Sequence, residues 1–381
     1  MIYLDYNATT PVDESVLEAM LPYFSQIFGN PSSSQHALGH WANQAIGRSR
    51  EQVASLVGVS PQSVVFTSGA TEAINLAFYG TAAVENRHRV LVSSIEHKAV
   101  LEAAELHCGN SHRTVELVPV NLDGTINFDA LEDLLDDHVA LVAVMHANNE
   151  VGAVQDVAKI SQAVHAKGAI LMSDVTQSVG KIPVNIETLG IDMAALSSHK
   201  IYGPKGSGAL CVSRSLRKSL APLLTGGGQE GGLRAGTENV PGIVGFGAAC
   251  NLAKQELSRY QENTSRVLNE FKIALAKDVK NWKVNSGEVS TLPNTANIRF
   301  FGADAEAVMA RTPGVAFATG SACQTSVPAP SHVLTAMGLT LEEARECVRI
   351  SVGKYTTMED AAKAAQLIAK SVNEVRLIDG D

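Results

Sequence analysis

The chain has 381 residues, of which 45% are hydrophobic and 18% charged, and its formal net charge at pH 7 is −9. This composition is typical of a folded globular protein, and the length favours two domains over one. The acidic balance argues against direct binding of nucleic acid through a charge-neutralising face. Because the sequence has no apolar run long enough to cross a bilayer and no signal peptide at its start, we expect a cytoplasmic protein without membrane association.

The chain opens with a polar, turn-rich segment over residues 3–11, and its pattern then predicts a helix over residues 13–27. The next stretch, residues 29–36, reads Gly-Asn-Pro-Ser-Ser-Ser-Gln-His and is not expected to form regular structure. Its side-chain donors suit either the capping of helices or the lining of a site, and both remain open here.

Between residues 63 and 212, short β-branched runs alternate with amphipathic helical stretches. The predicted strands cover residues 64–67, 90–93, 115–120, 140–146, 169–173, 193–197 and 209–212. This alternation predicts an α/β fold with a mostly parallel seven-stranded sheet wrapped by helices. Since ligands of such sheets bind beyond the carboxyl ends of the strands, the residues after each run are the first candidates for a site.

Polar residues do follow these runs. Gly69, Ala70 and Thr71 come after the first run and open a helix, whose N-terminal amides suit a phosphate or simply belong to an ordinary helix cap. The polar residues after the later runs include His97, Asn149, Asp174 and Gln177. Each has a plain structural explanation as a packing residue or a cap. Together they would place a base, an anion, amides and a phosphate cradle at one sheet edge, which coincidental caps explain less well.

Lys200 follows an apolar run, residues 191–196, that predicts a buried strand. A lysine at such a strand end has its stem in an apolar wall, where desolvation favours the free amine that a Schiff-base lysine requires. Gly203 and Pro204 then turn the chain abruptly, so no helix covers the amine. The alternative is a surface lysine in a turn.

The last third of the chain begins with a glycine-rich stretch, residues 222–239, that favours close approach of the backbone to another group. A long helix is predicted from about residue 244 to residue 275. Segments of a small α+β domain follow at 294–300, 302–311, 348–352 and 358–375. We therefore expect a large domain over residues 13–255 and a small domain made of residues 1–12 and 256–381.

The sequence contains five widely spaced cysteines and no C-x-x-C pair, so neither a disulfide framework nor a metal site is expected. Cys211 and Cys250 stand in apolar runs and are predicted core thiols. Cys323 stands among small residues and prolines, residues 318–330, which predicts an exposed loop. Since an accessible thiol is prone to oxidation, a catalytic role and an incidental one are both open for Cys323.

The motifs LDYNATTP, TSGATEA, NNEVG, DVTQSVGK, SSHKIYGPKG, LRAGTEN, GSAC and RISVG occur in this order over essentially the whole chain. On these motifs the chain resembles the cysteine desulfurases of the NifS/IscS type, which belong to the class-V aminotransferases and to fold type I of the pyridoxal-phosphate enzymes. The resemblance implies pyridoxal 5′-phosphate as cofactor, L-cysteine as substrate, L-alanine as product and a homodimer. The small domain would carry the catalytic cysteine loop.

The resemblance also implies a role for each residue of the cofactor site. Lys200 would hold the cofactor as a Schiff base, Asp174 would pair with the pyridine nitrogen, and His97 would stack on the ring as an acid–base group. Asn149 and Gln177 would lie near the ring hydroxyl. The residues expected around the phosphate are Ala70, Thr71, Ser197 and His199, with Thr237 from the partner subunit.

For the substrate and the sulfur, the resemblance points to three residues. Arg349 would bind the substrate carboxylate, with Asn30 nearby, and Cys323 would take the sulfur as a persulfide. The length of the loop after Cys323 matches the class that passes sulfur to an acceptor protein. Thr319 stands where serine is commoner in the family, which is a mild departure.

The destination of the sulfur is open among iron–sulfur clusters, tRNA thiolation and DNA phosphorothioation. The chain has a shorter C-terminal end than the enzymes that dock on the iron–sulfur scaffold, so we expect a specialised pathway, with DNA phosphorothioation preferred. Other functions remain as alternatives: a selenocysteine lyase or transaminase-type reaction on the same fold, or a sulfur-relay adaptor that only binds partners. An aminotransferase reaction does not require a thiol such as Cys323, and an inactive adaptor does not require the cofactor-binding residues. Both alternatives are therefore less favoured than a cysteine desulfurase.

Overall fold

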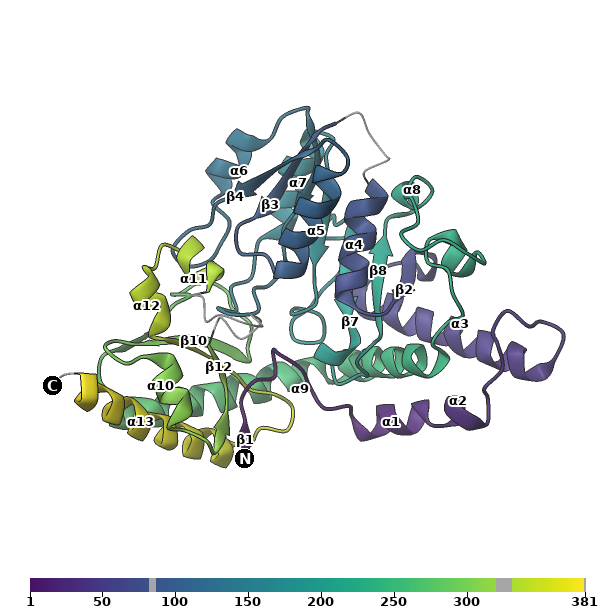
Figure 1. Cartoon of the computed structure of the whole chain (residues 1–381). Coiled ribbons are helices and arrows are strands. Elements are labelled where there is room, and N and C mark those ends of the chain that lie inside the picture. The colour runs from purple at the N-terminus through teal and green to yellow at the C-terminus, as the bar shows by residue number, and fades with distance from the viewer. Residues whose placement is uncertain (82–86, 320–330, 380–381) are drawn as a thin grey trace.

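The computed structural model describes residues 1–81, 87–319 and 331–379 (Figure 1). Its centre is a seven-stranded sheet. The strand order is β2 (Val64–Thr67), β8 (Gly208–Val212), β7 (Met193–Ser197), β6 (Ile170–Asp174), β5 (Val139–Ala143), β3 (Arg89–Ser93) and β4 (Thr114–Val118). Strand β8 runs antiparallel to both of its neighbours, and the other pairs are parallel. The predicted α/β fold with a mostly parallel sheet is confirmed.

Except at the edge strand β4, the sheet is buried on both faces, which explains why these strands appear in the sequence as continuous apolar runs. Successive residues of a strand point to opposite faces, so Leu91 packs on one side and Val90 and Val92 on the other. The first face is covered by α3 (Ala37–Val57), α7 (Val157–Ala166) and the start of α9 (Val240–Asp278). The second face is covered by α4 (Ala70–Thr81) and α5 (Lys98–Gly109), while α6 (Phe128–Leu134) packs beside β4.

The helix predicted over residues 13–27 is wrong as a single element. The structure has α1 (Glu14–Met20) and α2 (Pro22–Ser25) in its place. Pro22 has no N–H to donate to the preceding turn, and it takes the first position of the second helix, where that N–H is not needed. The short helix α8 (Arg214–Arg217) follows β8.

A second core surrounds a four-stranded sheet with the order β12 (Ala318–Thr319), β13 (Cys347–Ser351), β10 (Thr295–Phe300) and β9 (Trp282–Val284). Helices α10 (Ala305–Ala310) and α13 (Met358–Asp379) contribute to this core. The chain start joins them, because β1 (Ile2–Tyr3) pairs with β11 (Val315–Ala316). Helices α11 (His332–Ala336) and α12 (Leu341–Arg345) contact Ile95 and Met145 at the edge of the large sheet.

Helix α9 is 39 residues long and connects the two cores, as Figure 1 shows. Phe246 and Cys250 pack in the core of the large sheet, whereas Phe271 and Leu275 pack in the second core. We propose a large domain over residues 13–255 and a small domain of residues 1–12 and 256–381. The packing of the two cores supports this division. Within the described residues, no helix is both long enough and apolar enough to cross a membrane.

Both predicted core thiols are confirmed. Cys211 is 1% exposed and Cys250 is fully buried. Burial raises the pKa of Cys211 to about 12 and raises that of Cys250 well above its usual value. Both thiols are therefore protonated and unreactive at neutral pH.

The glycine-rich stretch before α9 is held in place by Glu230. Its two carboxylate oxygens accept hydrogen bonds from Nη1 and Nη2 of Arg50 at 2.7 and 2.6 Å. The backbone N–H of Phe66 donates to the same carboxylate at 2.9 Å. A bidentate guanidinium–carboxylate pair of this kind fixes orientation as well as distance, so it ties the stretch to α3 and β2.

We predict that Glu230→Ala lowers the free energy of unfolding by about 3 kcal/mol, because Arg50 and the Phe66 N–H lose their shared partner inside the protein. Urea denaturation measures the change. Glu374→Ala is the matched control, since the ion pair of Glu374 with Lys370 is exposed and 3.8 Å long. The control should change stability by less than about 0.5 kcal/mol. Equal losses in the two variants would contradict this account of the stretch.

Candidate functional site

The carboxyl ends of the parallel strands meet at one edge of the large sheet. Asp174 is the last residue of β6 and pairs in register with Ala195 of β7, the strand that leads to Lys200. His97 caps α5 just after β3, and Ala70 begins α4 just after β2. Because β2 and β7 are both antiparallel to β8, they point the same way and their ends share this edge. The structure thus brings the main residues predicted from the sequence together.

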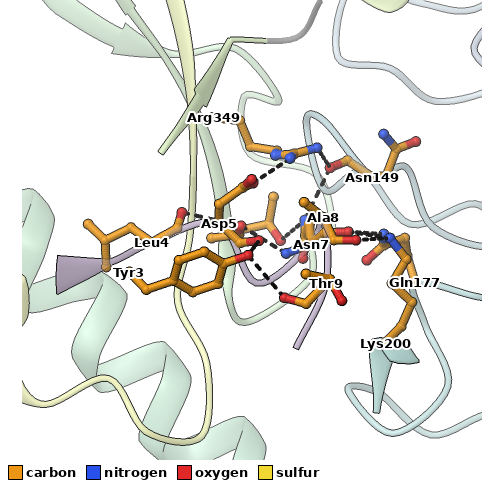
Figure 2. Close-up of polar contacts among 12 residues, drawn as sticks. Tyr3, Leu4, Asp5, Asn7, Ala8, Thr9, Asn149, Gln177, Lys200 and Arg349 are labelled. Atoms are coloured by element: carbon orange, nitrogen blue, oxygen red, sulfur yellow. Dashed lines mark hydrogen bonds and ion pairs between the residues drawn. The ribbon is translucent and has the colours of Figure 1, made fainter. Parts of the chain in front are cut away.

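Lys200 ends a single helical turn, residues 198–200, directly after β7. Its Nζ donates to the backbone carbonyl oxygens of Asn7 and Ala8 at 2.6 and 2.7 Å, as Figure 2 shows. The turn needs glycine at position 203, because a Cβ there would lie 2.0 Å from Oγ of Ser198. Because of the two hydrogen bonds to Asn7 and Ala8, the N-terminal segment lies directly against the amine of Lys200.

Asn7 is 1% exposed, and both its backbone and its side chain form hydrogen bonds with other segments of the chain. Besides Lys200, its backbone carbonyl accepts from Nε2 of Gln177 at 3.0 Å. Its side-chain Nδ2 donates to Thr295 at 2.8 Å and to the carbonyl of Asn149 at 3.1 Å. Sequence analysis missed Asn7 as a site residue, although it lies in the LDYNATTP motif; the only signal was a polar residue in an otherwise turn-like segment.

His97 both caps a helix and faces the site. Its Nδ1 accepts from the N–H of Ala99 at 3.1 Å, so the neutral ring carries its proton on Nε2. Burial lowers the pKa of His97 most, Asp174 opposes this effect, and the charge of Lys200 adds to it. The imidazole is therefore neutral at pH 7 and offers an N–H to a neighbouring group.

Asp174 is 8% exposed, and its Oδ1 accepts from the N–H of Thr176 at 2.9 Å. Among the residues that the structure describes, Asp174 forms no ion pair. A buried carboxylate needs a cationic partner to offset its desolvation. Its charge acts on both His97 and Glu96, which places all three groups close together.

The predicted phosphate residues lie around the start of α4. The first amides of a helix have no partners within the helix, so Ala70 and Thr71 can donate to an anion. A Cβ built on Gly69 would lie 4.0 Å from Oγ of Ser197, so this hydroxyl is close to the same helix end. Nδ1 of His199 lies 3.1 Å from Oγ1 of Thr9, and burial lowers the pKa of His199 to about 4.

Arg349, on β13 of the four-stranded sheet, is 6% exposed and points toward Asp5 and Asn149 (Figure 2). Its Nη2 forms an ion pair with Oδ1 of Asp5 at 2.6 Å, and its Nη1 donates to the carbonyl of Asn149 at 3.1 Å. Its Nε is buried without a hydrogen-bond partner among the described residues. The guanidinium is thus fixed in direction by the chain start and by the loop after β5.

For three predicted site residues, Thr237, Asn30 and Cys323, the described part of the chain gives no contact with the rest of the site. Thr237 and Asn30 are exposed, and the Asn30 side chain accepts from the N–H of Ser32 at 2.9 Å, which is a local cap. Cys323 lies outside the described residues. Their roles stay predictions.

Two buried carboxyl groups near the site, Glu96 and Glu150, follow predicted strands but were assigned no role from the sequence. Oε1 of Glu96 accepts from the N–H of Met145 at 2.6 Å, and burial raises the pKa of Glu96 well above its usual value. Glu150 accepts from the hydroxyl of Ser331, the residue that caps α11. Burial raises the pKa of Glu150 to about 7, because the charged form loses its hydration.

Comparison with known proteins agrees with the resemblance to cysteine desulfurases that the sequence motifs indicate. Residues 2–363 match the family described as Aminotransferase class-V. A protein named cysteine desulfurase from Frankia sp. (strain EuIK1) is 46% identical over 99% of this chain and 92% of its own length. A solved structure titled NifS-like protein has a TM-score of 0.90 and 35% identity over 98% of this chain and 99% of its own. Another, titled SspA in complex with cysteine, has a TM-score of 0.83 and 36% identity over 94% and 100%.

Glu150 gives the site a predicted pH signature. Its folded pKa of about 7 exceeds the ordinary value of 4.5, so the stability that its neutral form contributes is lost as pH rises through this window. Glu150→Gln stays neutral, so its unfolding free energy relative to the unmodified chain should rise between about pH 5 and pH 8, by roughly 3 kcal/mol. Urea denaturation at several pH values measures this. Glu288→Gln, at an exposed glutamate, should show no such trend, and a flat difference for Glu150→Gln would contradict the prediction.

Proposed function

The chain belongs to the class-V aminotransferase family and is a pyridoxal-phosphate-dependent cysteine desulfurase; on this premise we propose which of its residues perform the reaction and where the sulfur goes. The proposed reaction converts L-cysteine to L-alanine at the edge of the large sheet. The sulfur leaves on Cys323 and passes to an acceptor protein.

The residues at the sheet edge fit the cofactor. The start of α4 and the hydroxyl of Ser197 offer donors to a phosphate. Asp174, a buried carboxylate without an ion pair among the described residues, matches a protonated pyridine nitrogen. Lys200 would supply the amine that holds the cofactor. When bound, the cofactor supplies an electron sink for the pair left when the substrate loses a proton from Cα.

Three side chains of this protein then hold the substrate or move protons. The guanidinium of Arg349, fixed by Asp5 and Asn149, binds the substrate carboxylate. The amine of Lys200 and the neutral imidazole of His97 exchange protons with the substrate. The observation that carries the proposal is the convergence of Lys200, Asp174 and the α4 N-terminus on one edge of the sheet.

We propose that sulfur transfer occurs on Cys323. This part of the proposal rests on the sequence alone. The Cys323 thiolate attacks the sulfur of L-cysteine, the bond between that sulfur and the substrate carbon breaks, and its electron pair stays with the carbon. Protonation of this carbon gives L-alanine, and the enzyme keeps a persulfide. A thiolate of an acceptor protein then takes the outer sulfur and restores the Cys323 thiol.

The proposed acceptor is a protein because the chain is acidic, with a net charge of −9, and therefore repels a polyanion such as DNA or RNA. A homodimer is also proposed. It is supported by large apolar side chains that are exposed along α1, α2 and the start of α3 in the single chain, namely Leu17, Leu21, Phe24, Phe28 and Trp41. Location in the cytoplasm and the pathway that uses the sulfur stay predictions.

Cys323→Ser tests the sulfur step, because a hydroxyl keeps the volume of the thiol and loses the nucleophilic thiolate. With L-cysteine labelled in its sulfur, alanine formation and labelled persulfide should both fall to the level seen without enzyme. Binding of L-cysteine, followed by the change in the visible cofactor spectrum, should survive. Cys108→Ala, which removes a thiol buried in α5, is the matched control and should keep both activities. Equal turnover in Cys323→Ser would show that Cys323 is incidental.

The same label identifies the acceptor. Enzyme loaded with labelled sulfur is mixed in turn with candidate acceptor proteins, an iron–sulfur scaffold protein, DNA and tRNA. Label should move to a cysteine of an acceptor protein, and Cys323→Ser should transfer none. Label on nucleic acid in the absence of any other protein would contradict the argument from net charge.

A further inference from the structure

Lys181 is among the largest fully buried side chains of the described chain. Its Nζ donates to Oε1 of Gln177 at 2.6 Å and to Oδ1 of Asn7 at 2.9 Å. Within the described residues it forms no ion pair. A lysine is seldom buried without a carboxylate, so its position calls for a physical reason.

The turn after β6 places Lys181 beneath Gln177. Gly180 has φ of +72°, a left-handed conformation that favours glycine, and a Cβ there would lie 2.8 Å from Cγ2 of Ile201. The backbone N–H of Lys181 donates to the carbonyl of Ser178 at 3.0 Å and closes the turn. The lysine side chain therefore returns toward the site and does not project to the surface.

Since an ammonium group only donates hydrogen bonds, it fixes the direction of the amides that it contacts. The Oε1 atom of Gln177 faces Lys181, so its Nε2 points to the opposite side, where it donates to the carbonyl of Asn7. That carbonyl also accepts from Lys200. Lys181, Gln177, Asn7 and Lys200 thus form one connected network, drawn in part in Figure 2.

The charges around Lys181 leave its ammonium uncompensated. The titratable groups on the elements packed against it are Lys200, Tyr202, Glu256, Tyr260, Arg349 and Lys354. The carboxylate in this set, Glu256, pairs with Lys354 at 2.8 Å. Burial lowers the pKa of Lys181 well below its usual value, and the charges of Lys200 and Arg349 lower it further. When protonated, Lys181 adds a positive charge behind Lys200.

We propose that Lys181 is a positioning residue of the reaction: it holds the amide of Gln177 so that Nε2 donates to the Asn7 carbonyl that also accepts from Lys200, and in its protonated form it places a positive charge behind Lys200. The inference rests on the proposed function, in which Gln177 lies near the ring hydroxyl. A purely structural lysine would tie Asn7 to the turn after β6 and have no effect on the chemistry.

The two roles differ in the pH titration of the visible cofactor band of the holoenzyme. A nearby positive charge opposes protonation of the Lys200 nitrogen that holds the cofactor. Lys181→Met removes the charge and both donors but keeps the length of the side chain, so the midpoint of the band should move upward by about one pH unit. The kcat for L-cysteine should fall by about tenfold or more with little change in KM, because Arg349 still binds the substrate.

Two further variants complete the design. Lys181→Arg keeps the charge, and its midpoint should stay closer to that of the unmodified enzyme than the midpoint of Lys181→Met. Lys254→Met is the matched control: this lysine also makes two hydrogen bonds, to the backbone carbonyl and hydroxyl of Ser55 on α3, but its side chain is exposed. It should leave the midpoint and kcat unchanged.

A Lys181→Met enzyme that unfolds at lower temperature but titrates like the unmodified enzyme would overturn the inference and leave a structural role. If Lys181→Met does not fold, Lys181→Gln takes its place, since it keeps a donor but loses the charge; an unshifted midpoint in that folded variant would overturn the inference equally. Failure of the proposed function is a different result, because the unmodified protein would then show no visible cofactor band at all.

Discussion

The backbone carbonyl of Asn7 is the point on which the rest of the site depends. It accepts hydrogen bonds from Lys200 and from Gln177, which both come from the large sheet. The side chain of the same residue donates to Thr295 of the four-stranded sheet. Because Asn7 is almost fully buried, each of these groups would lose a partner in the interior if the segment moved, and buried polar groups without partners are costly. Asn7 therefore links the position of Lys200 to that of the four-stranded sheet.

The charges of the site explain how an acidic protein can bind anionic ligands. The basic residues Lys200 and Arg349 lie at the sheet edge with Lys181 directly behind them, although the chain as a whole has a net charge of −9. His97 and His199 do not add to them, since burial lowers both pKa values. The amino acid carboxylate and the cofactor phosphate both bring negative charge to this place. Asp5, which pairs with Arg349, and Asp174 offset part of the positive charge, and these ligands compensate more of it.

The fold and the main site residues could be predicted because their signals are local. Strands buried on both faces give continuous apolar runs, and the rule that ligands bind at the carboxyl ends of the strands then selects His97, Asp174 and Lys200. The break at Pro22 was also readable from the sequence but was missed. Lys181 could not be found in this way, because its role depends on a contact with a residue 174 positions away in the sequence. No local pattern contains such a contact.

The attachment of the cofactor to Lys200 tests the account most directly. The protein is loaded with pyridoxal 5′-phosphate, treated with borohydride to make the link to the lysine permanent, digested and analysed by mass spectrometry. The account predicts the modification on the peptide that contains Lys200 and none on Lys181, whose amine is held by Asn7 and Gln177. Modification of Lys181 or of surface lysines in place of Lys200 would contradict it.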